Sequence, residues 1–175
     1  IKNGGNFWIV IDKDKIIESV IEISKIIGSD NIYVRYDPIF LSDKYNLDYH
    51  IKAFDRLCSL LNGYVKHIIV SFIDDYKNVR KNMGVLRVKP FDFEDYKKIG
   101  TSFSFITSKY NMTVQTCFEK INLVEYGFIK GDCLGVELAK RLTGKDKFKK
   151  SKVRKGGLCN CVEMADIGYY NSCKH

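Results

Sequence analysis

The sequence alternates short apolar runs with longer segments in which apolar residues recur every three or four positions, and this alternation most constrains the fold. The apolar runs predict strands over residues 6–11, 32–36, 67–72 and 112–117. The segments between them predict helices that begin at Asp12 or Asp14, at Asp48, and at Pro90 or Asp92. A shorter helix is predicted over residues 134–143, before Gly144.

Alternating strands and helices favour a parallel sheet with right-handed crossovers. The sequence therefore predicts an α/β fold, either a partial TIM-like barrel or an open, mainly parallel sheet of about four β/α units. Strands that are apolar throughout predict a sheet covered on both faces, and Pro38 is expected to end the second strand. The length indicates one domain, with β/α units over residues 1–144 and a basic loop and Cys-rich metal-binding tail over 145–175.

The net charge of +8 is concentrated toward the C-terminus, most densely over residues 145–155. Such a run can bind a nucleic-acid backbone, although a solvated loop is the simpler interpretation. No apolar run is long enough to cross a membrane and no secretion signal is visible, so we expect a cytoplasmic protein without a membrane partner. Because the chain begins at Ile1, its natural N-terminus is expected to lie upstream.

Ionisable side chains follow the predicted strands at the edge where parallel sheets bind ligands. Arg35 lies inside an apolar run, where an unpaired guanidinium is costly, so we expect it to pair with Asp37, Asp74 or an anionic ligand. The three residues are the predicted catalytic groups of one pocket, whose substrate is unknown. The alternative, that Asp37 and Asp74 only cap turns, stays open.

Six cysteines without a secretion signal indicate a reducing compartment rather than a disulfide scaffold. Cys58 lies on the apolar stripe of a predicted helix and is expected to act as a small hydrophobe. Four others lie at a strand end, before a helix or in a loop, where thiolates suit zinc or iron–sulfur; they are Cys117, Cys133, Cys159 and Cys161. If they share a zinc ion, their sulfurs should lie about 3.5–4 Å apart.

Several motifs occur in the order found in one functionally uncharacterised microbial family, a domain of unknown function, which the sequence resembles over nearly its whole length. The C-terminal cysteine cluster of that family is similar to the iron–sulfur motif of radical S-adenosylmethionine (SAM) enzymes. The motifs are Arg35-Tyr36-Asp37-Pro38-Ile39, His50, Phe54, residues 71–77, Cys117-Phe118-Glu119, Gly131-Asp132-Cys133, Cys159-Asn160-Cys161 and residues 166–175.

The resemblance implies a partial TIM-like barrel with a 4Fe–4S cluster and SAM as cofactors, zinc being the alternative metal. Cys173 would be the first ligand of that cluster, and the remaining cysteines outside the core would form a second metal site. In the family the tail continues as C-x3-C-x2-C, whereas this sequence ends at His175, so we expect a C-terminal piece that is inactive alone. A zinc-stabilised nucleic-acid-binding protein and a metal-free α/β domain are the competing interpretations.

Overall fold

The computed structural model describes residues 12–74, 77–117, 119, 121–129, 131–150, 161–163 and 165. Three of the predicted strands are confirmed, and the one predicted over residues 6–11 lies outside the described residues. No helix in these ranges is long and apolar enough to cross a membrane. The elements are α1 (Lys13–Ile27), η1 (Ser29–Asn31), β1 (Tyr33–Ile39), α2 (Leu47–Leu60), β2 (His67–Phe72), α3 (Lys77–Leu86), α4 (Phe93–Lys109), β3 (Thr113–Thr116), η2 (Val124–Tyr126) and α5 (Val136–Thr143).

The described strands form a small open sheet in the order β1-β2-β3, and both pairings are parallel. The register aligns Arg35 with Ile69 and Ile69 with Gln115, and Ile129 adds a single parallel bridge to Gln115 at the outer edge of β3. The fold is therefore mixed α/β, as predicted, but the four β/α units of a barrel are not confirmed.

Two details of the sequence prediction are wrong. Strand β1 does not end before Pro38, because it runs on to Ile39 after its register with β2 shifts beyond Tyr36. The N-cap of α2 is Asn46, whose side chain accepts from the backbone N–H of Tyr49. Asp48 lies instead in the first turn of α2, where it pairs with Lys98.

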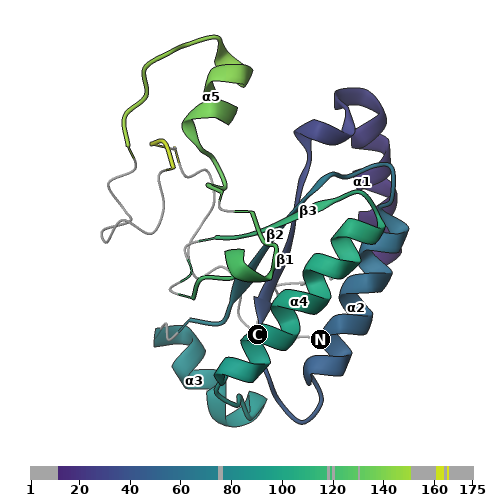
Figure 1. Cartoon of the computed structure of the whole chain (residues 1–175), viewed down its shortest axis with the longest axis vertical. Coiled ribbons are helices and arrows are strands. Elements are labelled where there is room, and N and C mark those ends of the chain that lie inside the picture. The colour runs from purple at the N-terminus through teal and green to yellow at the C-terminus, as the bar shows by residue number, and fades with distance from the viewer. Residues whose placement is uncertain are drawn as a thin grey trace, which may run out of the picture.

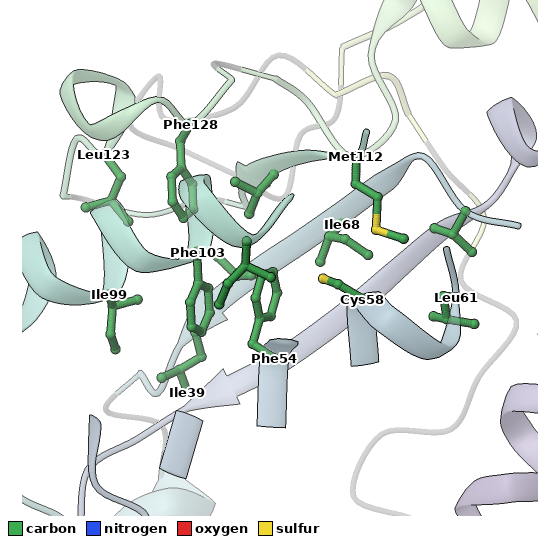
Figure 2. Packing of buried hydrophobic residues seen from close by; sticks show 14 of the residues in the cluster. Ile39, Phe54, Cys58, Leu61, Ile68, Ile99, Phe103, Met112, Leu123 and Phe128 are labelled. Carbon is green, nitrogen blue, oxygen red and sulfur yellow. The ribbon is translucent and has the colours of Figure 1, made fainter. Parts of the chain in front are cut away.

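Helices α1, α2 and α4 lie together on one side of the sheet (Figure 1). The rings of Phe54 and Phe103 stack in the core between α2, α4 and the strands, with centroids 3.8 Å apart (Figure 2). The two ring planes are nearly parallel, at an angle of 1°. Gly100 in α4 allows Tyr126 to pack closely, because an added Cβ would lie 2.7 Å from the tyrosine ring.

The two faces of the sheet differ in chemistry, since successive side chains of a strand point to opposite sides. The face toward the helices carries buried apolar residues such as Ile68, Val70 and Val114. The prediction of strands that are apolar throughout is therefore wrong for the other face. That face carries Tyr33, Arg35, Asp37, His67, Ser71, Thr113 and Gln115, with Ile69 among them.

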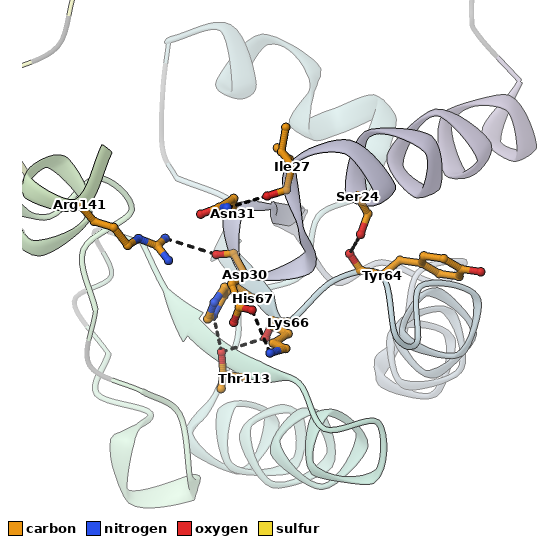
Figure 3. Close-up of polar contacts among 9 residues, drawn as sticks. All are labelled: Ser24, Ile27, Asp30, Asn31, Tyr64, Lys66, His67, Thr113 and Arg141. Carbon is orange, nitrogen blue, oxygen red and sulfur yellow. Dashed lines mark hydrogen bonds and ion pairs between the residues drawn. The ribbon is translucent and has the colours of Figure 1, made fainter. Parts of the chain in front are cut away.

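Complementary polar contacts tie the elements together at the N-terminal end of the sheet (Figure 3). His67 Nδ1 lies 3.0 Å from Thr113 Oγ1, linking β2 to β3. Lys66 pairs with Asp30 of η1 at 3.0 Å, and Arg141 of α5 donates to the Asp30 carbonyl at 3.4 Å. These contacts therefore connect neighbouring elements at this end of the sheet, and each of them joins a donor to an acceptor.

Candidate metal centre

Three thiols from separate segments meet near the C-terminal end of β3. Cys133 Sγ lies 3.6 Å from Cys117 Sγ and 3.4 Å from Cys161 Sγ. Both separations exceed the roughly 2.05 Å of a disulfide bond, so these are non-bonded contacts. Cys117 and Cys161 are buried, with exposed fractions of 8% and 2%. The structure therefore brings together three of the four cysteines predicted to bind metal.

The local backbone explains how Cys133 reaches Cys117. The Cys117 N–H donates to the Val70 carbonyl at 3.1 Å, which holds Cys117 at the end of the β2–β3 ladder. The following chain returns along β3, where the Ile129 N–H donates to the Val114 carbonyl at 2.8 Å. Two residues further, an added Cβ at Gly131 would lie only 2.6 Å from Gln115 Oε1. Glycine thus permits the close approach that positions Cys133.

A second contact brings in Cys161. The Val162 N–H donates to the Leu134 carbonyl at 3.0 Å, and Val162 also bridges to Lys150. These hydrogen bonds place residue 161 beside the turn that carries Cys133. Cys159, the remaining predicted ligand, and Cys173, the predicted cluster ligand, both lie outside the described residues.

The contacts around Cys133 favour the protonated form of its thiol. The pKa of the Cys133 thiol is raised by its hydrogen bond to Cys117, by burial and by its hydrogen bond to Cys161. Crowded thiols cannot all ionise unless a cation offsets their charge. As they stand, the described residues include no group of three or more His, Cys, Asp or Glu side chains arranged to hold a metal ion.

Arg35 pairs with Asp37, which is one of the three partners that the sequence left open for it. Arg35 Nε donates to Asp37 Oδ2 at 2.7 Å, and the Ser71 hydroxyl donates to the same oxygen at 3.2 Å. Partial burial acts to lower the pKa of Arg35, but hydrogen bonds to Cys117 and Asp37 raise it overall. The pair thus borders the thiol cluster directly.

Glu119 is a candidate that sequence reasoning missed, although it lies in the strand-end motif with Cys117. Its carboxylate accepts from the Phe72 N–H at 2.9 Å. Burial and the nearby charges of Asp74 and Cys117 together raise its pKa to about 7, although the hydrogen bond from Phe72 acts to lower it. A carboxyl group with such a pKa can exchange a proton near neutral pH.

Asp74 follows β2 and lies beside Glu119 and Tyr96, since its charge raises the pKa of both. Of the three predicted catalytic residues, the structure therefore joins Arg35 and Asp37 directly and places Asp74 next to Glu119. Cys58 is fully buried in the core, and burial raises the pKa of its thiol to about 12. It behaves as the small hydrophobe that its position on the helix predicted.

These features describe an α/β protein with a cysteine-lined, charged site at the C-terminal edge of a parallel sheet. The family model of the domain of unknown function DUF1848 matches residues 9–175, so the chain belongs to that family. The predicted membership of an uncharacterised family is confirmed, while similarity to radical SAM enzymes is not shown. No curated protein and no solved structure matches the chain.

Proposed function

We propose that the chain binds a single metal ion through Cys117, Cys133 and Cys161, with Cys159 as the fourth ligand. The supporting observation is the pair of Sγ separations, 3.6 and 3.4 Å. Two zinc–sulfur bonds of about 2.3 Å at a tetrahedral angle hold their sulfurs about 3.8 Å apart, so small movements suffice to place an ion. Thiolates are also the soft ligands that zinc prefers in structural sites.

The compact spacing favours one ion over an iron–sulfur cluster at these cysteines, because a cluster would spread its ligands further apart. The described thiols are not yet arranged around one point. The proposal therefore includes small movements of Cys117, Cys133 and Cys161 toward one point as the metal binds.

The metal centre would adjoin a ligand pocket. Arg35 and Asp37 supply fixed charges there, and Asp74 and Glu119 lie at the end of β2. Ligands of parallel α/β sheets bind outside the carboxyl ends of the strands, which is where these residues lie. Glu119 would hold or release a proton, and Arg35 would orient an anionic group of a substrate whose identity is open.

We further propose, from the order of the family motifs, that the full-length protein carries a separate 4Fe–4S cluster with Cys173 as its first ligand. Bound SAM and the cluster would supply radical chemistry. The winding of the chain supports a barrel-like arrangement, because α1, α2 and α4 pack on one side of strands that pair in sequence order. A doubly wound sheet has helices on both sides.

The first test is the zinc, iron and sulfide content of the chain purified under anaerobic conditions. We expect about one zinc per chain, and its loss in Cys133→Ala, because Cys133 contacts both neighbouring thiols. The matched control is Cys58→Ala, which removes a core thiol and should keep the metal. An equal metal content in Cys133→Ala and the parent chain would overturn the proposal.

The cluster proposal has its own test in the full-length protein. Cys173→Ala should remove iron and sulfide and leave zinc unchanged, because the two sites use different cysteines. A full-length protein purified anaerobically without iron or sulfide would contradict the radical SAM part of the proposal. It would leave the single-ion site standing.

A further inference from the structure

The register of the sheet places Arg35 on the same face as the thiol site. Arg35, Ile69 and Gln115 form one row across the three strands. Two residues after each of these come Asp37, Ser71 and Cys117, at a point where the register of β1 shifts and β3 has just ended. The Ser71 hydroxyl still reaches Asp37 Oδ2 at 3.2 Å, so Asp37 and Ser71 stay on the face that carries Arg35. A guanidinium at Arg35 thus lies one row behind Cys117, within reach of its sulfur.

Asp37 and Ser71 fix the direction of that guanidinium. Asp37 pairs with Arg35 through both Nε and one terminal nitrogen, and Ser71 donates to the same carboxylate oxygen. Arginine carries five N–H donors in a rigid fork, so this anchoring leaves other donors to point elsewhere. A side-chain hydrogen bond with Cys117 is among the causes of the raised pKa of Arg35, which places these donors beside the Cys117 sulfur. The Arg35 side chain keeps an exposed fraction of 42%, so the contact lies at the rim of the site.

Charge balance gives this contact a consequence. Three or four thiolates around a divalent ion leave a net negative charge, and a buried charge is costly unless it is offset or hydrogen-bonded. Glu119 and Asp74 add negative charge near Cys117. A cation beside Cys117 would therefore stabilise the metal-bound state more than the metal-free state, because metal binding gathers thiolates at one place.

We infer that Arg35 is a positioning residue of the metal centre, which rests on the proposed function. Its guanidinium, oriented by Asp37 and Ser71, donates to the Cys117 thiolate and offsets the charge of the thiolate–metal site. Groups that hydrogen-bond metal ligands set both the ligand orientation and the metal affinity, and their loss typically weakens binding about 10–100-fold.

The test compares Arg35→Gln with Arg56→Gln, which makes the same charge change on an exposed residue of α2, a helix on the opposite face of the sheet. Zinc affinity is measured by competition with a chromophoric chelator. We expect Arg35→Gln to bind at least about tenfold more weakly and Arg56→Gln to match the parent chain. Equal affinities of Arg35→Gln and the parent chain, or an equal loss in Arg56→Gln, would overturn the inference.

A second readout separates positioning from stability. In the cobalt-substituted protein the sulfur-to-cobalt charge-transfer band reports the thiolates themselves. We expect this band to shift in Arg35→Gln, and in Arg35→Lys, which keeps the charge without the planar fork. Unchanged bands in both variants would reduce Arg35 to a surface ion-pair residue. A parent chain that binds neither zinc nor cobalt would instead refute the proposed function itself.

Discussion

The two ends of the sheet differ in how their side chains interact. At the N-terminal end, Lys66 meets Asp30 and His67 meets Thr113, so each donor faces an acceptor and the contacts link neighbouring elements (Figure 3). At the C-terminal end, three thiols crowd one another and raise the pKa of Cys133. Contacts between like groups of this kind contribute little to the stability of the fold. We interpret the C-terminal end as shaped for binding and the N-terminal end as shaped for stability.

The largest effect is expected for Gly131→Ala. The new methyl group would lie 2.6 Å from Gln115 Oε1, so the Gln115 amide and the loop that carries Cys133 must shift relative to each other. We expect a loss of zinc affinity of more than about tenfold, as for other changes that misplace metal ligands. Chelator competition checks this expectation.

Gly84→Ala is the matched control for that variant. Gly84 lies in α3, an added Cβ meets nothing within 4 Å, and alanine favours a helix over glycine. This variant should keep the affinity of the parent chain. If Gly131→Ala also kept it, the contact with Gln115 would not be what places Cys133.

The second expected effect is a loss of stability at low pH, which should depend on the N-terminal end of the sheet and not on the thiol site. Burial lowers the pKa of His67 below its ordinary value of 6.5, so protonation of His67 opposes folding. Its contribution to stability is complete above the unfolded pKa and declines as the pH falls through about 6.5 toward the lower folded pKa. Denaturant unfolding from pH 8 to pH 5, in metal-free protein, should show this decline weakened in His67→Gln.

Zinc affinity should also fall with pH, but for a different reason, because the thiols must lose their protons to bind metal. The pH dependence of zinc affinity should therefore be the same in His67→Gln and in the parent chain. A change in both pH profiles would show that the two ends are coupled, against the comparison drawn here.

A smaller effect is expected for Thr113→Val. The hydroxyl bonds His67 Nδ1 and also donates to the Lys66 carbonyl at 3.1 Å, so its removal should cost about 1 kcal/mol of unfolding free energy. Thermal or urea unfolding measures this cost. Zinc affinity should not change, and a parallel loss of affinity would contradict the separation of the two ends.

The smallest effect is expected for Asp30→Asn. The ion pair with Lys66 is exposed on both sides, and exposed pairs contribute little because water and salt screen them. Unfolding curves of the variant and the parent chain should nearly coincide at physiological salt. A clear destabilisation would show that the carboxylate of Asp30 matters more than its exposure implies.

The sequence predicted the elements whose apolar pattern is unbroken. The predicted bounds of β2 agree with the structure, and Asp12 and Asp92 cap α1 and α4 as expected. Helix α3 was missed because Lys, Arg and Asn make up half of its ten residues and the helical spacing of Val79, Met83 and Leu86 was overlooked. The choice of Asp48 over Asn46 as a cap was wrong because both residues satisfy the same preference, and only the backbone distinguishes them.

The candidate site also combines features that the sequence predicted with features that it did not. The pairing of Arg35 with Asp37 follows from alternation along one strand, and residue chemistry alone pointed to the cysteines. The raised pKa of Glu119 could not be predicted, because it depends on burial and on Asp74, which lies on another strand end. The placement of Cys133 depends on the close approach of Gly131 to Gln115, which is a contact in three dimensions that no local sequence pattern indicates.

X-ray absorption at the zinc edge of the purified chain tests the central claim most directly. We expect three or four sulfur ligands at about 2.3 Å, as thiolate zinc centres show, and fewer sulfurs in Cys133→Ala. A spectrum of the parent chain fitted by nitrogen and oxygen ligands alone would contradict the account, since the thiols around Cys133 would then have no part in metal binding.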